Sequence, residues 1–337
     1  MSAAIPSATD RLSGLPPFDL LDQRRGKWQA RRKEWLAIGL DPSVGRPGRL
    51  LLSTATSRDP SYYQQFQAAK DAAGRDLTAA EFEADQYRQS ASMAGGGAFG
   101  TGTSQFDPVL CELAYRWWTA PGWLILDPFA GGPTRGVVAA VIGRRYIGCD
   151  LSAAQVEANR AHCAELAMRG IPSLTSAEWA HADAARWVDS LDPGSVDFVW
   201  TCPPYLWTER YSDDPADLST MTVDQYERAL RRIVDGAACA LRADRFAGLV
   251  IGDVRARDGR LIDLRGMAIR AFEDAGLHLV SAAVLIPPCG TSAMRGYHAM
   301  RTGRSLGRGH QHTLIFVKGS RRAATSSVRV DDRGDWR

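Results

Sequence analysis

The sequence predicts an α/β fold in which a mainly parallel sheet is covered by helices on both faces. From residue 104 onward, short apolar segments alternate with amphipathic helical patterns. Such alternation is typical of strands joined by helical crossovers in a parallel sheet. No helical pattern separates the last two apolar segments, which predicts an antiparallel hairpin at one edge of the sheet.

The expected elements follow one another in chain order. Helices are predicted at 106–118, 134–142, 153–169, 223–241 and 261–275. Strands are predicted at 123–126, 146–149, 175–181, 196–201, 246–251, 279–286 and 312–317. Asp107-Pro108 opens the first helix, where proline is favoured because its missing N–H would have no helical acceptor.

Composition divides the chain into four segments. Residues 1–17 are small, polar and interrupted by proline, which predicts a disordered leader. Residues 18–103 form a basic, aromatic extension that ends in a glycine-rich hinge, and residues 104–318 carry the α/β pattern. Residues 319–337 are charged and poor in apolar side chains, which predicts a flexible tail.

The amino-terminal extension allows two interpretations. Trp28 and Trp35 lie on one face of a helical pattern, with arginines and lysines on the opposite face. The pattern suits an arm that contacts nucleic-acid phosphates and stacks its aromatic rings. It also suits a surface helix that docks on the core.

Composition also limits the classes of function. The formal net charge is +3, from 41 basic and 38 acidic residues, so total charge does not predict a nucleic-acid partner. The six cysteines include no C-x-x-C pair, which argues against a zinc cluster. The start does not resemble a signal peptide and the apolar runs are too short to cross a bilayer, so we expect a cytoplasmic protein with no metal and no membrane partner.

A glycine-containing turn follows the first predicted strand. The segment LILDPFAGGPT begins as an apolar strand, reaches Asp127 and turns through Gly131 into a helix. Ligands of open α/β sheets lie beyond the carboxyl ends of the strands, and glycine lets them approach the backbone closely. The turn lacks both G-x-G-x-x-G and a phosphate-loop lysine, which argues against a dinucleotide or ATP.

Acidic residues follow the next two strands as well. Asp150 ends the second strand, where an acid accepts hydrogen bonds from ribose hydroxyls. Asp183 follows the third strand, where its carboxylate would accept from the amino group of an adenine ring. Three acids around one turn suit a nucleoside with a positive centre, and S-adenosyl-L-methionine has both ribose and a sulfonium. The alternative is that these acids only cap helices.

A rigid corner follows the fourth predicted strand. The segment VDFVWT runs into Cys202-Pro203-Pro204-Tyr205, where two prolines fix the backbone. An exocyclic amine is a poor nucleophile because its lone pair is delocalised into the ring. Hydrogen bonds to carbonyls such as that of Pro203 would draw the nitrogen toward tetrahedral geometry, while Tyr205 stacks on a planar base. In-line attack on a methyl group then relies on proximity, without a general base or a metal.

Together the motifs DPFAGG and TCPPY resemble the N4-cytosine/N6-adenine DNA methyltransferase family, including phage-type modification methylases. The matching positions are Asp127, Pro128, Phe129 and Gly131 in the first motif and Pro203, Pro204 and Tyr205 in the second. The segment SQFDP resembles the family segment that packs over the methionine part of the cofactor, which assigns Phe106 and Asp107 to cofactor binding. The resemblance, over residues 104–318, implies a Rossmann-like class I fold and S-adenosylmethionine-dependent methylation of cytosine N4 or adenine N6 in DNA.

Cys202 departs from this family, which has Asp, Asn or Ser before the two prolines. The family side chain usually accepts from the target amine, whereas a thiol is a weak acceptor. Cysteine is closest in size to serine, which favours cytosine N4. A covalent mechanism at cytosine carbon 5 uses the order Pro-Cys, which this corner lacks.

The target nitrogen of duplex DNA lies inside the stack, so the base must be flipped out. Residues 206–214 are expected to close over that base, or to form an ordinary mobile loop. Residues 290–310 form a candidate DNA-contacting loop, or else a solvated loop. Its arginines, which suit phosphates or guanine edges, are Arg295, Arg301, Arg304 and Arg308.

The sequence leaves partners and alternatives open. Nothing in the chain resembles a large recognition domain, so recognition of DNA would be short or loose, or would need a second subunit. That subunit would be a second copy of the chain (a homodimer) or a companion restriction enzyme. An RNA or protein methyltransferase would use the same Pro-Pro-Tyr chemistry, although the arginine-rich segments favour a polyanion. A DNA-binding module without catalysis is the remaining alternative.

Overall fold

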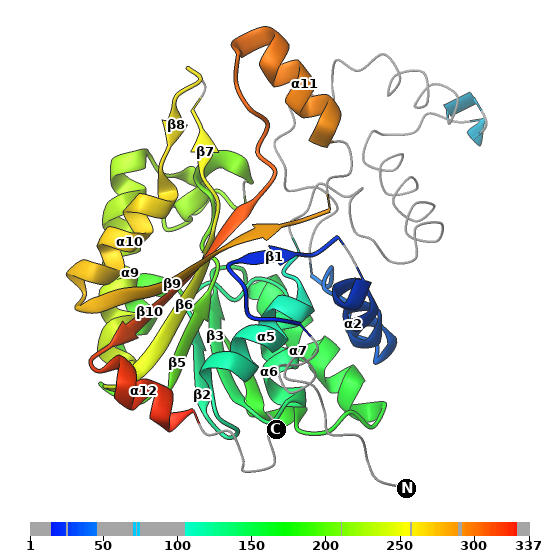
Figure 1. Cartoon of the computed structure of the whole chain (residues 1–337). Helices are drawn as coiled ribbons and strands as arrows, with labels where there is room; N and C mark the ends of the chain where they lie inside the picture. The colour runs from blue at the N-terminus through cyan, green and yellow to red at the C-terminus, as the bar shows by residue number, and fades with distance from the viewer. Residues whose placement is uncertain are drawn as a thin grey trace, which may run out of the picture.

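The structure, a computed structural model, describes residues 15–24, 26–45, 70–71, 73–74, 105–209, 211–256, 258–288 and 292–328. These residues form one eight-stranded sheet with helices on both faces (Figure 1). The expected leader up to residue 14 and the glycine-rich hinge lie outside the described residues. The predicted fold class, a mainly parallel sheet with an antiparallel pair toward one edge, is confirmed.

The elements match most of the predicted ranges to within a few residues. The strands are β1 Leu20–Asp22, β2 Leu124–Asp127, β3 Arg145–Asp150, β4 Ala177–His181, β5 Phe198–Thr201, β6 Arg245–Ile251, β7 Val254–Arg255, β8 Leu261–Ile262, β9 Leu277–Ile286 and β10 Gln311–Lys318. The helices are α2 Gly26–Ala37, α5 Pro108–Trp118, α6 Thr134–Val141, α7 Ala153–Met168, α8 Ala184–Asp189, α9 Val223–Ala240, α10 Leu264–Asp274, α11 Ser292–Gly303 and α12 Arg321–Ser327. Short 3₁₀ turns lie at Leu174–Ser176, Leu206–Thr208 and Leu218–Thr220.

The strand order places a switch point in the middle of the sheet. The order across the sheet is β1-β9-β10-β6-β5-β2-β3-β4. β2 pairs in parallel with β3 on one side and with β5 on the other, so the chain leaves β2 in one direction and later returns on the opposite side. Ligands of such sheets bind where the order reverses, beyond the carboxyl ends of the strands.

Side chains alternate between the two faces of the sheet, and each face packs against its own helices. On β5, Phe198 and Trp200 enter the core formed with α5, α6 and α7, whereas Val199 enters the core formed with α8, α9 and α10. On β10, Phe316 stacks on Phe272 of α10, with ring centroids 4.3 Å apart. The two cores hold β2 and β5 in fixed positions next to the switch point.

The elements that the sequence analysis did not predict include β1, α11 and α12. β1 pairs in parallel with β9 at the sheet edge, and its three residues are too few to produce a periodic signal. α11 lies between the last two strands, where glycines at both its middle and its end weaken the helical pattern. α12 occupies part of the expected flexible tail. Ser320 caps this helix, and Ala324 is buried against the rest of the fold.

None of the described helices combines the length and apolar character needed to span a bilayer. Within the same residues, no group of three or more His, Cys, Asp or Glu side chains is arranged to hold a metal ion. The cysteines in this part of the chain are free thiols, of which Cys111, Cys149 and Cys163 are buried.

Helix α2 docks on α5 through buried polar bonds. Trp28 Nε1 donates to Asp107 Oδ1 at 3.1 Å, and Trp35 Nε1 donates to Glu112 Oε2 at 2.7 Å. Arg31 Nε also donates to Glu112 Oε2, at 2.7 Å. Of the two interpretations of this segment, the docked helix is confirmed. The stacking arm is wrong for α2, because both tryptophans are buried in the core.

We expect Glu112→Gln to lower the free energy of unfolding by about 1–3 kcal/mol at pH 7, because the buried carboxylate loses its charged bonds to Arg31 and Arg116. Burial raises the pKa of Glu112, but the bonds and charges of the two arginines outweigh burial and lower it. A lowered pKa gives stability above the unfolded-state value, about 4.3, that is lost as pH falls through the folded-state value. In urea denaturation, the difference in free energy of unfolding between wild type and variant should therefore be smaller at pH 3 than at pH 7.

Glu34→Gln is the matched control. Glu34 also pairs with Arg31, at 2.7 Å, but its side chain is 63% exposed. Solvent screens such a pair, so we expect a change of about 0.5 kcal/mol or less. Equal losses in the two variants would contradict the role of Glu112 in docking α2.

Candidate active site

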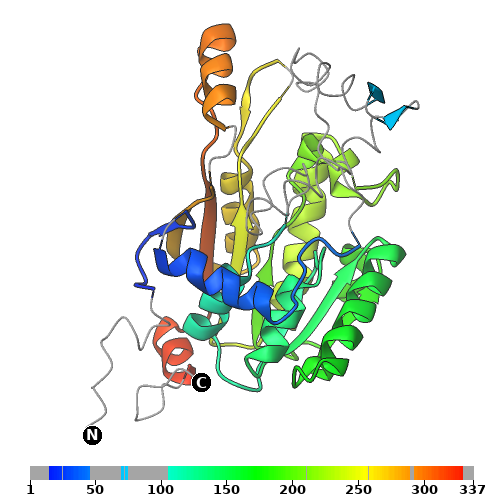
Figure 2. The same ribbon diagram turned by 90° about the vertical axis from the view of Figure 1, so that its right-hand side faces the viewer.

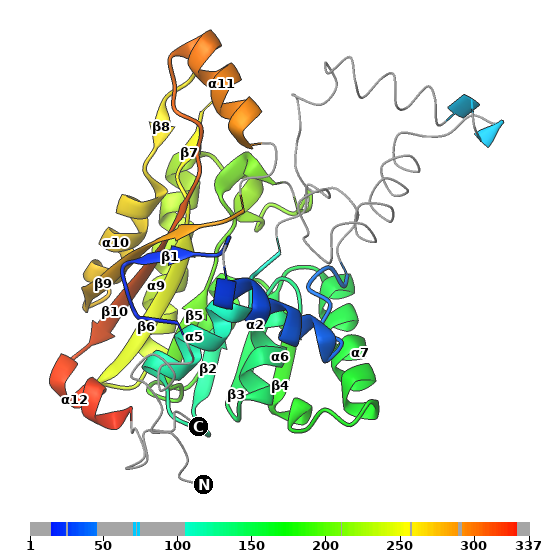
Figure 3. The ribbon, with the colours of Figure 1, turned by 45° about the vertical axis from the view of Figure 1, so that its right-hand side comes forward.

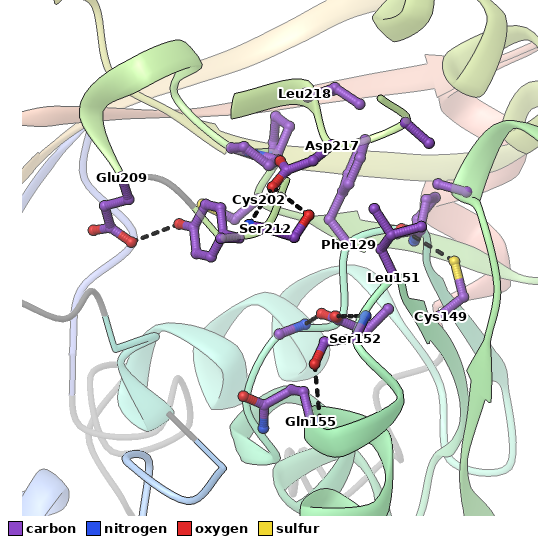
Figure 4. A pocket seen from close by; sticks show the side chains of 18 of the residues that line it. Phe129, Cys149, Leu151, Ser152, Gln155, Cys202, Glu209, Ser212, Asp217 and Leu218 are labelled. Atoms are coloured by element: carbon purple, nitrogen blue, oxygen red, sulfur yellow. Dashed lines mark hydrogen bonds between the residues drawn. The ribbon is translucent and has the colours of Figure 1, made fainter. Parts of the chain in front are cut away.

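A cavity of about 580 Å³ lies at the carboxyl ends of β2, β3 and β5 (Figure 4). This volume is in the range of small-molecule and cofactor sites. One wall is the glycine-containing turn after β2, and another is the Pro-Pro-Tyr corner after β5. The predicted site residues that line it are Phe106, Pro128, Phe129, Gly131, Asp150, Asp183, Cys202, Pro203, Pro204 and Tyr205. The two motifs therefore face one common cavity.

Hydrogen bonds hold the turn after β2 in place. Gly131 has a φ of 52°, in the left-handed region that glycine adopts without strain. Its N–H donates to Asp150 Oδ2 at 2.9 Å, and its carbonyl accepts from Asn159 Nδ2 at 2.7 Å. Asp150 Oδ1 accepts from the N–H of Ser152 at 2.8 Å. The acid at the end of β3 thus lines the cavity and also fixes the turn.

Asp183 caps a helix and also lines the cavity. Its Oδ1 accepts from the N–H of Ala185 at 3.0 Å, which caps α8. The same residue lines the cavity. A carboxylate has several acceptor sites on its two oxygens, so capping does not prevent a bond to a ligand.

Asp127, predicted to contact the cofactor, does not line the cavity. It is fully buried behind the turn, where Oδ1 accepts from Thr201 Oγ1 at 2.6 Å and from the N–H of Phe129 at 3.1 Å. Its Oδ2 accepts from the hydroxyl of Tyr146 at 2.8 Å and from Arg135 Nε. The prediction of direct contact is wrong because the turn folds over this carboxylate, which instead ties the turn to β3, β5 and α6.

Asp107 differs from its predicted role in the same way. Its Oδ1 accepts from the N–H groups of Val109 and Leu110, at 2.9 and 3.1 Å, as the cap of α5. The same oxygen receives the bond from Trp28, and the residue is not part of the cavity wall. Burial raises the pKa of this carboxyl despite the nearby charge of Arg32. Phe106, the other residue assigned from this segment, does line the cavity.

Side-chain bonds brace the Pro-Pro-Tyr corner. Cys202 Sγ lies 3.4 Å from the hydroxyl of Tyr205, and that hydroxyl accepts from Gln311 Nε2 at 3.2 Å. The hydroxyl of Tyr226 donates to the Pro204 carbonyl at 2.9 Å. Burial raises the pKa of the Cys202 thiol, so it stays protonated at neutral pH. A neutral thiol is a poor nucleophile, which argues further against a covalent mechanism.

Topology and cavity together decide the fold class. The five neighbouring strands β4, β3, β2, β5 and β6 are parallel to one another. β10 lies between β6 and β9 and is antiparallel to both. The cavity lies where the order of these strands reverses. This chain has the class I methyltransferase fold.

Solved structures that resemble this class I fold include methyltransferases with different substrates. A geranyl diphosphate methyltransferase in complex with GPP and sinefungin is 18% identical and matches 62% of this chain and 78% of that chain, with a TM-score of 0.44. A putative DNA modification methylase from Thermus thermophilus, complexed with S-adenosyl-L-methionine, is 17% identical over 41% of this chain and 52% of that chain, with a TM-score of 0.31. The precorrin-6Y C5,15-methyltransferase from Geobacter metallireducens is 12% identical over 64% and 89%, with a TM-score of 0.40.

No protein-family model matches the sequence, and no curated protein matches it. The likeness to the solved structures concerns the fold alone. The substrate therefore has to be inferred from the residues of this site.

Arg135 is a cavity residue that the sequence analysis missed. It is buried, pairs with Asp127, and donates through Nη2 to the carbonyl of Ala130 at 2.9 Å. Its guanidinium lies 4.4 Å from the ring centroid of Phe106. Burial opposes the charge of Arg135, but the charge of Asp127 outweighs burial and raises the pKa above its ordinary value. The available signal was one arginine inside the apolar helical segment TRGVVAAV.

The segment after the corner is fixed by its own hydrogen bonds. Asp217 Oδ2 accepts from the N–H of Ser212 at 2.7 Å and from its hydroxyl at 3.0 Å. Glu209 is 8% exposed, and its Oε2 accepts from the hydroxyl of Tyr211 at 2.6 Å. These side chains line the same cavity as the turn after β2. Whether residues 206–214 close over a base or form an ordinary mobile loop stays a prediction.

Three of the predicted DNA-contacting residues, Arg301, Arg304 and Arg308, do not line the cavity. Arg301 on α11 and Arg304 just after it are exposed. Arg308 Nη1 donates to the carbonyl of Asp253, so this side chain ties the segment before β10 to the segment before β7. The side chain of Arg295 lies outside the described part of the structure. Both interpretations of residues 290–310 assumed a loop, which is wrong for residues 292–303 because they form α11.

We expect Thr201→Val to lower the free energy of unfolding by about 1.5–3 kcal/mol, because it removes a buried hydrogen bond to the charged Asp127 carboxylate. Valine keeps the size and the strand preference of threonine. Chemical denaturation of both proteins measures the difference.

Thr313→Val on β10 is the matched control. Thr313 is also buried, but its hydroxyl has no hydrogen-bond partner among the described residues. Removing an unsatisfied buried hydroxyl should leave the stability unchanged or raise it. Equal losses of stability in the two variants would show that the hydrogen bond from Thr201 to Asp127 does not stabilise the fold.

Proposed function

We propose that this chain transfers the methyl group of S-adenosyl-L-methionine to the exocyclic amine of cytosine or adenine in DNA. The observation that carries the proposal is the common cavity of the cofactor turn and the Pro-Pro-Tyr corner. Adjacent strand ends would bring a methyl donor and a planar amine together, and proximity of this kind supplies much of the rate.

The part of the cavity next to β2 and β3 suits S-adenosyl-L-methionine. Asp150 and Asp183 both line the cavity. We expect Asp150 to accept from ribose hydroxyls and Asp183 to accept from the adenine amino group. Phe106 and Phe129 supply apolar walls. The carboxylates attract the positive sulfonium. When bound, the cofactor supplies an electrophilic methyl group.

The corner after β5 binds the base that receives the methyl group. The Pro203 carbonyl accepts an amine N–H, and the ring of Tyr205 stacks on the base. The nitrogen lone pair forms the new N–C bond as the S–C bond breaks, and the nitrogen then releases one proton to water. The neutral Cys202 thiol packs beside the amine and forms no bond to carbon.

Two elements suit DNA phosphates outside the cavity. α11 and the β7–β8 hairpin project beyond the carboxyl ends of the sheet (Figures 2 and 3). Arg301 and Arg304 are exposed there, and Tyr297 of α11 is 70% exposed. Exposed arginines of this kind bind the phosphates of DNA. The cavity itself is lined by acids, so it suits the uncharged base of the same DNA rather than its phosphates. A partner protein, either a second copy of the chain or a companion restriction enzyme, and a cytoplasmic location stay predictions.

The purified protein is expected to move tritiated methyl groups from S-adenosyl-L-methionine to unmethylated duplex DNA. Nucleoside mass spectrometry should recover N4-methylcytosine or N6-methyladenine. Tyr205→Ala should keep cofactor binding in calorimetry but react about tenfold to 100-fold more slowly, because stacking contributes about 1–3 kcal/mol per base.

RNA and protein acceptors are tested in parallel with DNA. Label in RNA or protein, but not in DNA, would contradict the proposed substrate. Absence of cofactor binding would instead indicate a DNA-binding module without catalysis.

Replacing both Arg301 and Arg304 with alanine should weaken DNA binding without changing cofactor affinity. Loss of two phosphate contacts should reduce the slope of log K against log salt by about 2. The control replaces Arg321 and Arg322 of α12, which are also exposed but lie at the opposite end of the sheet (Figure 1). An equal effect of the two double variants would argue against DNA contact through α11.

A further inference from the structure

The corner after β5 lacks a strong side-chain acceptor for the amine that receives the methyl group. Cys202 occupies the position before the two prolines, and its thiol lies 3.4 Å from the hydroxyl of Tyr205. A thiol is a weak acceptor, and burial raises its pKa, so no thiolate forms at neutral pH. One N–H of the amine can bond to a proline carbonyl, but the other needs an acceptor elsewhere.

Glu209 supplies a carboxylate to the same part of the cavity. The residue is 8% exposed and lines the cavity together with Cys202 and Tyr205. In Figure 4, Glu209 lies on the opposite side of the cavity from Cys149 of β3, with Cys202 between them.

The surroundings hold this carboxylate in a defined position. The hydroxyl of Tyr211 donates to Glu209 Oε2 at 2.6 Å, and Asp217 fixes the following residues through Ser212. A carboxylate has about four lone-pair sites, so it can accept from a ligand while it keeps the bond from Tyr211. A partly desolvated carboxylate favours a ligand that donates hydrogen bonds and disfavours one that presents only carbonyl oxygens.

We propose that Glu209 is a substrate-binding residue whose carboxylate accepts a hydrogen bond from the exocyclic amine, in place of the weak acceptor Cys202. This inference rests on the proposed function and deepens it. The ligand of this part of the cavity is a base that carries an amino group, and Glu209 selects it over a base with an oxo group at the same position. Glutamate is a known acceptor for the amino group of cytosine.

The test measures methyl transfer to unmethylated duplex DNA by the full-length chain. Glu209→Ala should reduce the rate about tenfold to 100-fold, because a hydrogen bond to a charged group is lost. Its affinity for S-adenosylhomocysteine, measured by calorimetry, should stay within about twofold of wild type, since Glu209 lies away from the cofactor turn. Glu273→Ala, which removes an exposed carboxylate from α10, is the matched control and should react like wild type.

A second substitution separates substrate binding from a structural role. Cys202→Asn in the Glu209→Ala background supplies an amide oxygen at the corner. The double variant should methylate DNA at least about tenfold faster than Glu209→Ala alone. A rate for Glu209→Ala within about threefold of wild type, or no rescue by Cys202→Asn, would overturn the role of Glu209. Failure of the wild-type chain to methylate DNA would overturn the proposed function and this inference together.

Discussion

The buried carboxylate of Asp127 is the interaction on which the rest of the site depends. It accepts from the N–H of Phe129 in the turn, from Tyr146 on β3 and from Thr201 on β5, and it pairs with Arg135 on α6. A carboxylate without contact to water is stable only when its oxygens are paired and hydrogen-bonded. Because four elements share one acceptor, the cofactor turn and the corner after β5 cannot shift independently.

Charge is divided between the inside and the outside of the cavity. Asp150 and Asp183 line one part of the cavity and Glu209 lines another, while Arg135 is neutralised by Asp127. Arg301 on α11 and Arg304 just after it are exposed beyond the ends of the strands. This division suits a cationic cofactor and an uncharged base within the cavity, with the phosphates of the same substrate outside it. The chemistry then needs positioned acceptors rather than a strong base.

Local patterns predicted most of the sheet but missed elements that depend on distant contacts. The apolar strands and amphipathic helices of 104–318 follow from periodicity, because each buries one face or both faces in a core. β1 forms only because β9 offers an unpaired edge to three residues. α12 packs on the fold through the buried side chain of Ala324. α2 is held by the hydrogen bonds that Trp35 and Arg31 donate to Glu112. These contacts join residues that are far apart in the chain, so local sequence patterns cannot predict them.

The sequence by itself determined the fold class and the two corners of the cavity. Apolar runs that end in a glycine turn or in Pro203-Pro204 specify strand ends, and parallel strands place those ends at one edge. Only the tertiary structure decided which acids face the cavity. Asp127 and Asp150 both end strands, yet the turn buries the first and leaves the second in the cavity wall. The exposure of a side chain depends on what the rest of the chain packs over it, and that is settled only when the fold closes.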